Sequence, residues 1–301
     1  MTQRILVTGA SGFIGRHALA PLERSGAEVH AVGRTPVEVG ANVRWHQLDL
    51  LDHDARARLI EDVQPDMLVH FAWMTEHGKF WTSPDNLDWV AATLDMVRRA
   101  QECGLSRFVG LGTCFEYARQ TGKDCDERKT VTGPDTLYGV AKDGCRRIIE
   151  GFASYQSLSW AWGRFFLLYG PGETPTRLVP QVAQRLIAGA PAPIGPGHRP
   201  RDFMDSRDAG AATAALALSR VEGPVNIASG RASSVREVAE TLGALAGRPD
   251  LVKVGAHPDR DEPERIVARV DRLTREVGFT DIRPLEQGLK EALDWWREAA
   301  Q

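Results

Sequence analysis

The sequence predicts an α/β fold, in which a doubly wound parallel sheet with helices on both faces is followed by a smaller second domain. Over the first 170 residues, short apolar strands alternate with helical segments, and a glycine-rich turn joins the first strand to the first helix. Beyond Tyr169-Gly170-Pro171-Gly172, Pro and Gly become frequent and the elements become shorter. We therefore expect residues 1–170 to form mainly the first domain. Residues 171–301 should form mainly a discontinuous second domain, with some segments returning to the first.

The strands of the first domain are continuous apolar runs, which is typical of strands buried on both faces. We expect them at Ile5–Thr8, Glu28–Val32, Val43–Leu48, Met67–Phe71, Phe108–Leu111 and Ser159–Leu168. The helices between them are expected at Phe13–Ser25, Asp54–Asp62, Asn86–Cys103 and Asp135–Tyr155. Gly26 and Gly104 should end two of these helices, because glycine readily adopts the left-handed conformation that closes a helix.

The composition argues against several classes of function. A net charge of −3 gives no basic footprint for nucleic acid, and no apolar run reaches the ~20 residues that span a membrane. Met1-Thr2-Gln3-Arg4 leads directly into a strand, without the apolar segment of a signal peptide. The four cysteines lack C-x-x-C spacing. We therefore expect free thiols, no metal site and a cytoplasmic protein.

The turn after the first strand reads Thr8-Gly9-Ala10-Ser11-Gly12-Phe13-Ile14-Gly15. Glycine in such a turn permits positive φ and a close approach of the backbone to a pyrophosphate. The following helix adds unpaired N–H groups and the positive end of its dipole. The strand, glycine triplet and helix occur in the order that a dinucleotide site requires. The cofactor contacts expected here are Gly9, Ser11, Gly12, Phe13, Ile14 and Gly15.

The end of the second strand indicates which dinucleotide is bound. NAD sites place an Asp or Glu there for the ribose 2′-hydroxyl, whereas this chain reads Ala31-Val32-Gly33-Arg34-Thr35. Arg34 can pair with a 2′-phosphate, because guanidinium groups bind phosphate strongly. NADP(H) is therefore favoured. NAD(H) is the alternative, in which Arg34 is an ordinary surface residue.

Later strand ends should supply further cofactor contacts. Asp49, followed by Leu50, comes after the third strand and can accept a hydrogen bond from the adenine amino group; capping of the next helix is the competing role. The remaining expected contacts are Phe71, Ala72 and Trp73 at the end of the fourth strand, and Phe165 in the sixth.

A tyrosine and a lysine occur at i and i+4 of a predicted helix, as Tyr138 and Lys142. A phenol normally ionises near a pKa of ~10, and a nearby ammonium lowers that pKa. Tyr138 can then donate a proton to a ketone oxygen as hydride arrives at carbon, while Lys142 also holds the nicotinamide ribose. Thr113 follows the fifth strand, at the sheet edge where such folds bind ligands. Its hydroxyl can orient the carbonyl beside Tyr138.

With these residues the chain resembles the extended short-chain dehydrogenase/reductases, in the epimerase/dehydratase branch that acts on nucleotide sugars. The motifs that carry the resemblance are Thr8 to Gly15, the Thr113 segment, Tyr138 to Lys142, Tyr169 to Glu173, Arg201-Asp202-Phe203, Val225 to Gly230, and Pro284 to Leu289 with Trp295. The resemblance implies a Rossmann domain, a C-terminal nucleotide-sugar domain, and catalytic roles for Thr113, Tyr138 and Lys142. It also implies a homodimer through the two long helices, Asn86–Cys103 and Asp135–Tyr155.

Departures from related enzymes narrow the expected reaction. The sugar 4,6-dehydratases that this chain resembles carry Asp-Glu directly after the catalytic Thr, where this chain has Cys114 and Phe115, so dehydration is disfavoured. The epimerase–reductases that make GDP-fucose carry a Cys and a His at the positions of Phe115 and Arg177, so their chemistry is disfavoured too. Many 4-epimerases have an Asn where this chain has Leu167. A dissociable NADPH, as Arg34 indicates, suits a reductase, which must exchange its cofactor at every turnover.

The resemblance also implies which residues bind the substrate. Arg201 matches a diphosphate contact and Arg260 is a looser match; both have the fixed cationic donors that a diphosphate needs. Cys114 lies beside the catalytic Thr, and Arg177 and Val179 are expected to line the base or phosphate pocket. The aromatic segment from Trp73 to Trp81 can close over the hexose or pack on the sheet. His70, inside a strand, is expected to be structural.

We therefore expect an NADPH-dependent reductase of a nucleotide-activated 4-keto-6-deoxyhexose in deoxysugar biosynthesis. The expected partner is a nucleoside-diphosphate sugar. One alternative is a nucleotide-sugar epimerase that uses bound NAD(P). Another is a cofactor-binding regulator without catalysis, which the intact set of Thr113, Tyr138 and Lys142 disfavours.

Overall fold

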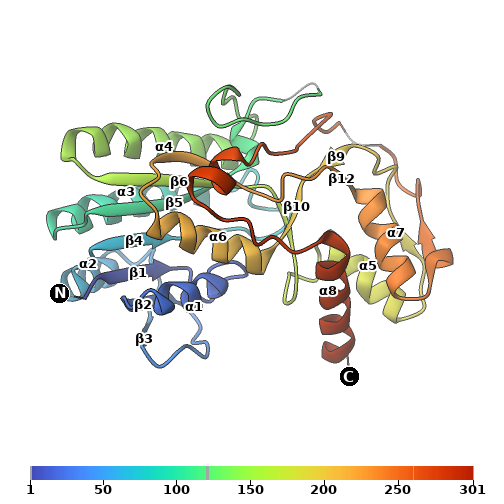
Figure 1. The fold of residues 1–301 in the computed structure, drawn as a ribbon, viewed down its shortest axis with the longest axis horizontal. Coiled ribbons are helices and arrows are strands. Elements are labelled where there is room, and N and C mark those ends of the chain that lie inside the picture. Colours follow the sequence, from blue (N-terminus) through green and yellow to red (C-terminus); the bar gives the residue numbers. More distant parts are fainter. Residues whose placement is uncertain (1, 120–121, 260, 301) are drawn as a thin grey trace.

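The computed structural model describes residues 2–119, 122–259 and 261–300, and its centre is a seven-stranded parallel sheet (Figure 1). The strand order is β11-β6-β5-β4-β1-β2-β3. Its strands are β1 (Arg4–Thr8), β2 (Glu28–Gly33), β3 (Val43–Gln47), β4 (Met67–His70), β5 (Arg107–Thr113), β6 (Ser159–Phe165) and β11 (Gly223–Ile227). The strand order changes direction between β1 and β4, because β2 and β3 lie on one side of β1 and β4, β5 and β6 lie on the other. Ligands of such sheets bind at the carboxyl ends of the strands beside this point.

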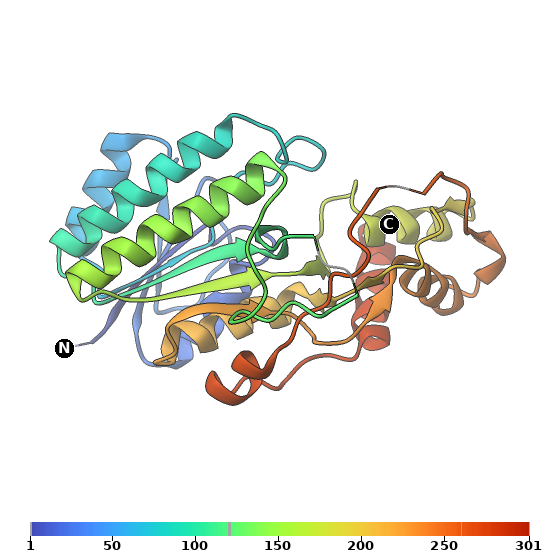
Figure 2. The same cartoon turned by 90° about the horizontal axis from the view of Figure 1, so that it is seen from above.

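Helices cover both faces of this sheet (Figures 1 and 2). The helices of the molecule are α1 (Arg16–Arg24), α2 (His53–Val63), α3 (Asp85–Glu102), α4 (Leu137–Gln156), α5 (Leu178–Ile187), α6 (Ser206–Leu218), α7 (Val235–Leu245) and α8 (Leu285–Ala299). Along β1, Ile5 and Val7 belong to the apolar core beneath α1 and α6. Leu6, between them, belongs to the core beneath α2, α3 and α4. This alternation explains why β1 is apolar at every position.

A further apolar core lies beyond the carboxyl ends of the strands, where α5, α7 and α8 pack together. Three two-stranded sheets accompany it, formed by β7 (Leu167–Tyr169) with β10 (Phe203–Asp205), β9 (Pro200–Arg201) with β12 (Ser233–Ser234), and β8 (Ala192–Pro193) with β13 (Val252–Lys253). The helix α6 and the strand β11 return to the large sheet. The C-terminal third of the chain therefore contributes both to the large sheet and to the core formed by α5, α7 and α8.

The α/β class and the doubly wound parallel sheet are as predicted, and three element boundaries are corrected. The first helix begins at Arg16 and not at Phe13, because Gly9 to Gly15 form a turn. The predicted strand Ser159–Leu168 is two strands: β6 ends at Phe165 and stays in the large sheet, whereas β7 pairs with β10. The helix predicted from Asp135 begins at Leu137, because the Thr136 side chain accepts a hydrogen bond from Gly139 N and caps it.

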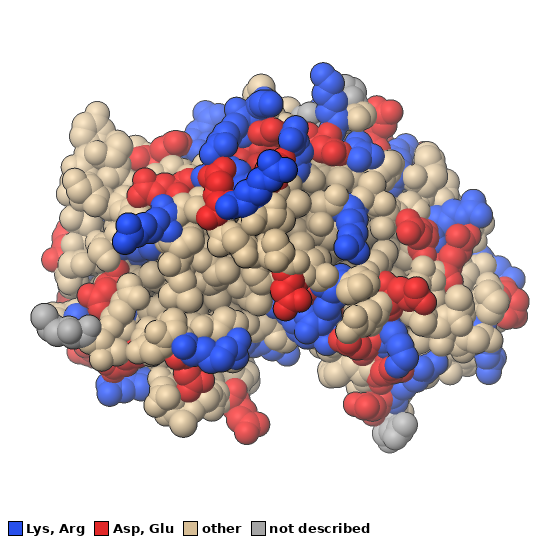
Figure 3. All heavy atoms as spheres, viewed as in Figure 1, with Lys and Arg blue, Asp and Glu red and all other residues tan. Residues whose placement is uncertain are grey.

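The surface combines mixed charge with one apolar strip. Acidic and basic side chains are interspersed over the face seen in Figure 3. Large apolar side chains are exposed on α3 and α4, which lie side by side over the sheet in Figure 2: Leu87, Val140, Ile148 and Tyr155. Of the helices in the described part of the chain, none is long and apolar enough to cross a membrane.

Candidate active site

Four predicted segments meet at the carboxyl edge of the sheet. The glycine turn follows β1, Phe71 to Trp73 follow β4, Thr113 ends β5 and Phe165 ends β6. Neighbouring strands are in parallel register, with Thr8 beside His70 and Thr113 beside Phe165. The strand ends therefore lie along one edge, where the sequence places its dinucleotide site.

The glycine turn has the backbone that a phosphate cradle needs. Gly9 has a φ of +66°, and a Cβ on it would lie 2.6 Å from Ala72 N. A Cβ on Gly15 would overlap Gly9 O. Only glycine lets these backbones pass so closely. The turn leads into α1, and its carbonyls at Gly12, Ile14 and Gly15 accept hydrogen bonds from the first N–H groups of that helix. These residues therefore fit the pyrophosphate of a dinucleotide.

The end of β2 lies against this turn. A Cβ on Gly33 would lie 2.6 Å from Ser11 Oγ and 2.8 Å from the Trp45 ring. The next residue, Arg34, has an exposed side chain, and its carbonyl accepts a hydrogen bond from Gln47 Nε2. The structure thus places Ser11 against Gly33, the residue before Arg34; contacts of Ser11 and Arg34 with the cofactor stay predictions.

Asp49 does not cap the following helix. The cap of α2 is Asp52, whose side chain accepts hydrogen bonds from Asp54 N and Ala55 N. Asp49 is exposed, and its Oδ1 accepts a hydrogen bond from Leu51 N. The competing capping role for Asp49 is therefore wrong, and its contact with adenine stays a prediction. Leu50, beside it, is buried.

His70 ties the ends of β1 and β4 to α3. Thr93 Oγ1 donates to Trp89 O, so it accepts from His70 Nε2, at 2.9 Å. His70 Nδ1 then accepts from Thr8 Oγ1, at 2.7 Å. Burial lowers the pKa of His70 to about 3, so the ring is neutral. A neutral, fully bonded imidazole is a structural residue, as the sequence predicted.

The structure places Thr113 close enough to Tyr138 for its hydroxyl to lower the pKa of the phenol. Both side chains are buried, and Tyr138 is 8% exposed. Burial raises the pKa of the Tyr138 phenol; the charges of Glu116 and Cys114 raise it further, whereas the Thr113 hydroxyl and Arg177 oppose them. Tyr138 is therefore protonated at neutral pH in this structure, which is the form of a proton donor.

Lys142 lies one helical turn after Tyr138, and its side chain extends to Trp73 in the segment that follows β4. Its Nζ donates to Leu111 O at 2.8 Å and lies 3.6 Å from the centre of the Trp73 ring. Burial lowers the pKa of Lys142 to about 7. Lys142 is not among the groups that shift the pKa of Tyr138 in this structure. That Lys142 lowers this pKa stays a prediction for the complex with cofactor.

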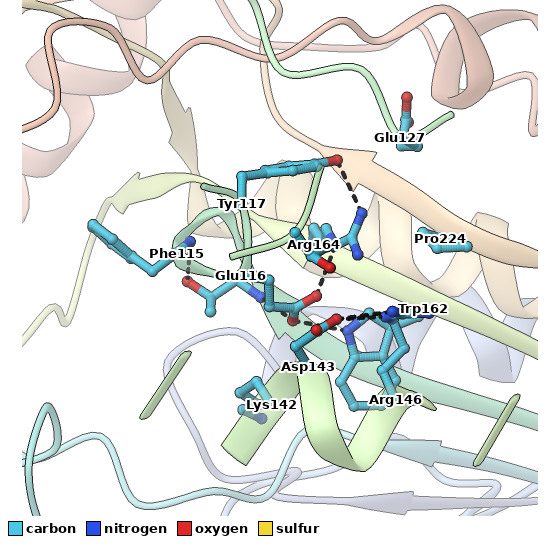
Figure 4. A network of polar contacts seen from close by, with 12 residues as sticks. Phe115, Glu116, Tyr117, Glu127, Lys142, Asp143, Arg146, Trp162, Arg164 and Pro224 are labelled. Carbon is cyan, nitrogen blue, oxygen red and sulfur yellow. Dashed lines mark hydrogen bonds and ion pairs between the residues drawn. The ribbon is translucent and has the colours of Figure 1, made fainter. Parts of the chain in front are cut away.

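A buried ion pair, formed by Glu116 and Arg164 (Figure 4), is hydrogen-bonded to the backbone of Thr113. Glu116 is fully buried, and its carboxylate accepts from Thr113 N at 3.0 Å, Trp162 Nε1 at 2.9 Å and Arg164 Nε at 2.7 Å. Thr113 Oγ1 in turn accepts from Phe115 N, so Thr113 and Glu116 cap the short 3₁₀ turn Cys114–Glu116 reciprocally. Glu116 therefore fixes the backbone that presents the Thr113 hydroxyl.

The same network reaches the C-terminal part of the chain. Arg164 donates to Tyr117 Oη at 3.1 Å, and Tyr117 Oη donates to Asn226 Oδ1 at 2.7 Å. The Asn226 side chain donates to the carbonyls of Cys125 and Arg269. The sequence indicated no role for Glu116 or Arg164. The available signal was an acid just after the fifth strand and an arginine among the apolar residues of the sixth.

The aromatic segment after β4 packs on the Tyr138 ring. The Phe80 ring meets the Tyr138 ring edge-on at 4.9 Å between centroids, and Trp81 does so at 6.0 Å. Trp81 also meets Phe115 at 4.7 Å, and Trp81 O accepts a hydrogen bond from Tyr138 N. An apolar wall therefore encloses the phenol.

The predicted substrate residues are dispersed. Arg177 lies over the Phe80 ring at 5.4 Å, close to Tyr138, and Cys114 is buried next to Thr113. Val179 is buried in the core of α5, α7 and α8 and does not join them. Arg201 is buried, with its guanidinium on Glu262 at 2.9 Å. Arg260 lies outside the described residues.

Comparison with known proteins gives consistent matches over nearly the whole chain. The family model that matches residues 5–228 is described as NAD dependent epimerase/dehydratase family. The chain is 26% identical to the dTDP-4-dehydro-6-deoxy-D-allose reductase of Streptomyces bikiniensis, with 97% of this chain and 96% of the relative covered. It is 25% identical to the GDP-6-deoxy-D-mannose reductase of Pseudomonas aeruginosa, with 98% of each covered.

The fold has counterparts among solved structures. The UDP-glucose 4-epimerase of Thermus thermophilus, in complex with NAD, superimposes with a TM-score of 0.86 and 24% sequence identity. This superposition covers 99% of the present chain and 100% of the epimerase.

Proposed function

The chain belongs to the NAD dependent epimerase/dehydratase family, and from this we propose that it is an NADPH-dependent reductase of a nucleoside-diphosphate 4-keto-6-deoxyhexose. The observation that carries the proposal is that Thr113 and Tyr138 are buried close together at the sheet edge that holds the glycine turn. A hydroxyl and a protonated phenol side by side are suited to holding and protonating one carbonyl oxygen.

In the proposed reaction, the bound cofactor supplies a hydride to the keto carbon. Thr113 donates a hydrogen bond to the carbonyl oxygen and orients it. Tyr138 gives its phenolic proton to the same oxygen as the carbonyl becomes an alcohol, and solvent later restores that proton. Lys142 in its ammonium form stabilises the phenolate left behind and holds the nicotinamide ribose. Glu116 keeps the Thr113 backbone in place throughout.

The apolar wall around Tyr138 supports a 6-deoxy sugar. Phe80, Trp81 and Phe115 offer aromatic surface beside the phenol, and a methyl group packs there at lower cost than a hydroxymethyl, whose hydroxyl would lose hydrogen bonds. The reductases from Streptomyces and Pseudomonas act on dTDP- and GDP-linked 6-deoxy sugars by name. Both observations support reduction of a deoxysugar over epimerisation of a fully hydroxylated one.

The fate of NADPH separates a reductase from an epimerase. Purified protein is incubated with dTDP- and GDP-linked 4-keto-6-deoxyhexoses, and the near-ultraviolet absorbance of NADPH is followed. A reductase consumes one NADPH for each sugar converted. An epimerase interconverts two sugars with no net loss of NADPH. Tyr138→Phe should lower turnover by about 10²–10⁴-fold and leave the Kd for NADPH nearly unchanged; normal turnover in this variant would refute the mechanism.

Arg34 is proposed to select the 2′-phosphate of NADPH. Its side chain is exposed at the end of β2, beside Ser11. Arg34→Ala should raise the KM for NADPH by about 10-fold or more and leave the KM for NADH unchanged, because a charge-assisted pair with phosphate is lost. Arg44→Ala, an exposed arginine on the neighbouring strand, is the control. An unchanged ratio of the two KM values in Arg34→Ala would exclude this role.

A further inference from the structure

Glu173 is a buried acid close to the proposed active site that the mechanism above does not use. It ends the turn Tyr169-Gly170-Pro171-Gly172-Glu173, and only 8% of the residue is exposed. Glu173 N donates to Gly170 O, which closes the turn. A Cβ on Gly172 would lie 3.3 Å from the Arg16 guanidinium, at the start of α1. The turn therefore lies against the segment that follows the glycine loop.

The carboxyl of Glu173 lacks a partner that its burial requires. Its Oε2 is inaccessible to solvent and forms no hydrogen bond with any residue in the described ranges. Burial raises the pKa of this carboxyl to about 8, and the positive charge of Arg177 only partly opposes that rise. A buried polar atom without a partner destabilises the fold, so its presence here points to a partner that arrives with a ligand.

The contacts of Arg177 link this carboxyl to the catalytic tyrosine. Arg177 interacts electrostatically with both Glu173 and Tyr138. Its guanidinium lies over Phe80, which meets the Tyr138 ring edge-on. Arg177 thus lies near both the Glu173 carboxyl and the Tyr138 phenol. A ligand whose keto oxygen lies on Tyr138 would bring the rest of its ring towards this carboxyl.

We propose that Glu173 binds a hydroxyl group of the sugar ring next to the carbon that is reduced. This proposal rests on the proposed function. A carboxylic acid and a hydroxyl each donate and accept, so they can pair in either direction. Phosphate is a poor partner for the same site, because a carboxyl facing phosphate oxygens would be repelled once ionised.

The inference is tested by the contribution of the sugar to binding. With NADP saturating, the Kd values of dTDP and dTDP-glucose, UDP and UDP-glucose, and GDP and GDP-mannose are measured by calorimetry for the wild type. The pair with the largest sugar effect is then measured for Glu173→Gln, Glu173→Met and the exposed control Glu286→Gln. Because Oε2 has no partner in the free protein, Glu173→Met should be at least as thermally stable as the wild type.

We expect Glu173→Met to weaken the sugar-bearing ligand by about 5-fold or more relative to the bare diphosphate, and Glu173→Gln to weaken it less. The Kd values for NADP and for the bare diphosphate should stay unchanged. An unchanged sugar effect in Glu173→Met would overturn the inference alone. So would a weakened NADP, since the partner would then be the nicotinamide carboxamide. A wild type that binds none of the three sugars better than its diphosphate would overturn the proposed function, and the inference with it.

Discussion

The amine of Lys142 is buried, and burial disfavours its charged form. Its pKa is lowered from 10.5 to about 7. Between these two values the unfolded chain holds a proton that the folded chain does not. Stability therefore rises with pH through this window, by up to about 1.4 kcal/mol for each pH unit. Below about pH 7 the folded protein carries the whole penalty of a buried ammonium.

The prediction is that Lys142→Met stabilises the protein most in acid. The Tm of this variant minus that of the wild type should be largest near pH 6 and should shrink as the pH approaches 10, because the wild type then loses its buried charge. Lys253→Met, at an exposed lysine, should show a difference that does not vary with pH over this range. A difference for Lys142→Met that grew with pH would contradict the assigned burial.

Disruption of the Glu116–Arg164 ion pair should lower the free energy of unfolding more than most other single substitutions do. Glu116→Gln leaves the Arg164 guanidinium buried and unpaired, so we expect a loss of about 3–5 kcal/mol in the free energy of unfolding. The double variant Glu116→Gln with Arg164→Met should recover at least half of this loss, because the unpaired charge is gone. Urea unfolding measures both. A double variant less stable than Glu116→Gln alone would rule out an unpaired charge as the cause.

Residues whose roles follow from local spacing could be predicted from the sequence. Tyr138 and Lys142 share one helix face, and Thr113 ends a strand. Helical spacing and the position at a strand end were therefore enough to identify them as candidates. Glu116 and Arg164 could not be predicted, because their roles arise from the pairing of β5 with β6. Arg201 looked like a free cation in the sequence, whereas the fold places Glu262 on its guanidinium.

At the scale of elements, the glycine turn between β1 and α1 is the most constrained segment of the cofactor site. Gly9→Ala would force an alanine to a φ of +66° and place its Cβ 2.6 Å from Ala72 N. We expect loss of NADPH binding and a lower Tm. Gly151→Ala, inside α4 with no atom within 4 Å of the added Cβ, should instead raise stability by about 0.5–1 kcal/mol. Titration of NADPH fluorescence and thermal unfolding report the two effects, and unimpaired NADPH binding by Gly9→Ala would argue against the proposed cradle.

The elements that apolar periodicity defines were predicted within a few residues. The boundary at Phe165 and Leu167 was missed, because the apolar run continues while the backbone leaves one sheet for another. The helix start at Arg16 was missed for a different reason. Phe13 and Ile14 are apolar and resemble a helix face, but the glycines on either side hold them in a turn.

At the scale of the whole molecule, the exposed apolar strip on α3 and α4 supports the proposed homodimer. Ile148 and Tyr155 are seven positions apart on one face of α4, and Tyr155 is 88% exposed. Ile148→Asp should give a monomer at micromolar concentration in light scattering, because a charge would be buried without a partner in the interface. Val254→Asp, at an exposed valine outside this strip, should leave the mass unchanged. A monomeric wild type, or a dimer that survives Ile148→Asp, would contradict the proposal.

The doubly wound form of the large sheet could be predicted because most of its strands alternate with helices in the sequence, β2 and β3 being the exception, and right-handed crossovers leave few topologies. The C-terminal part could not be predicted in the same detail. Its two-stranded sheets are two or three residues long, too short for a periodic signal, and they pair segments far apart in the chain.

Transfer of hydrogen from the cofactor to the sugar tests the central claim most directly. The protein is incubated with NADPH that carries deuterium at the transferable position, together with the dTDP- or GDP-linked 4-keto-6-deoxyhexose that it accepts, and the product is examined by NMR and mass spectrometry. A reductase that works through Tyr138 and Thr113 should place one deuterium on the former carbonyl carbon for each NADPH oxidised, and Tyr138→Phe should abolish this incorporation. Conversion of the sugar with no deuterium gained and no NADPH consumed would contradict it.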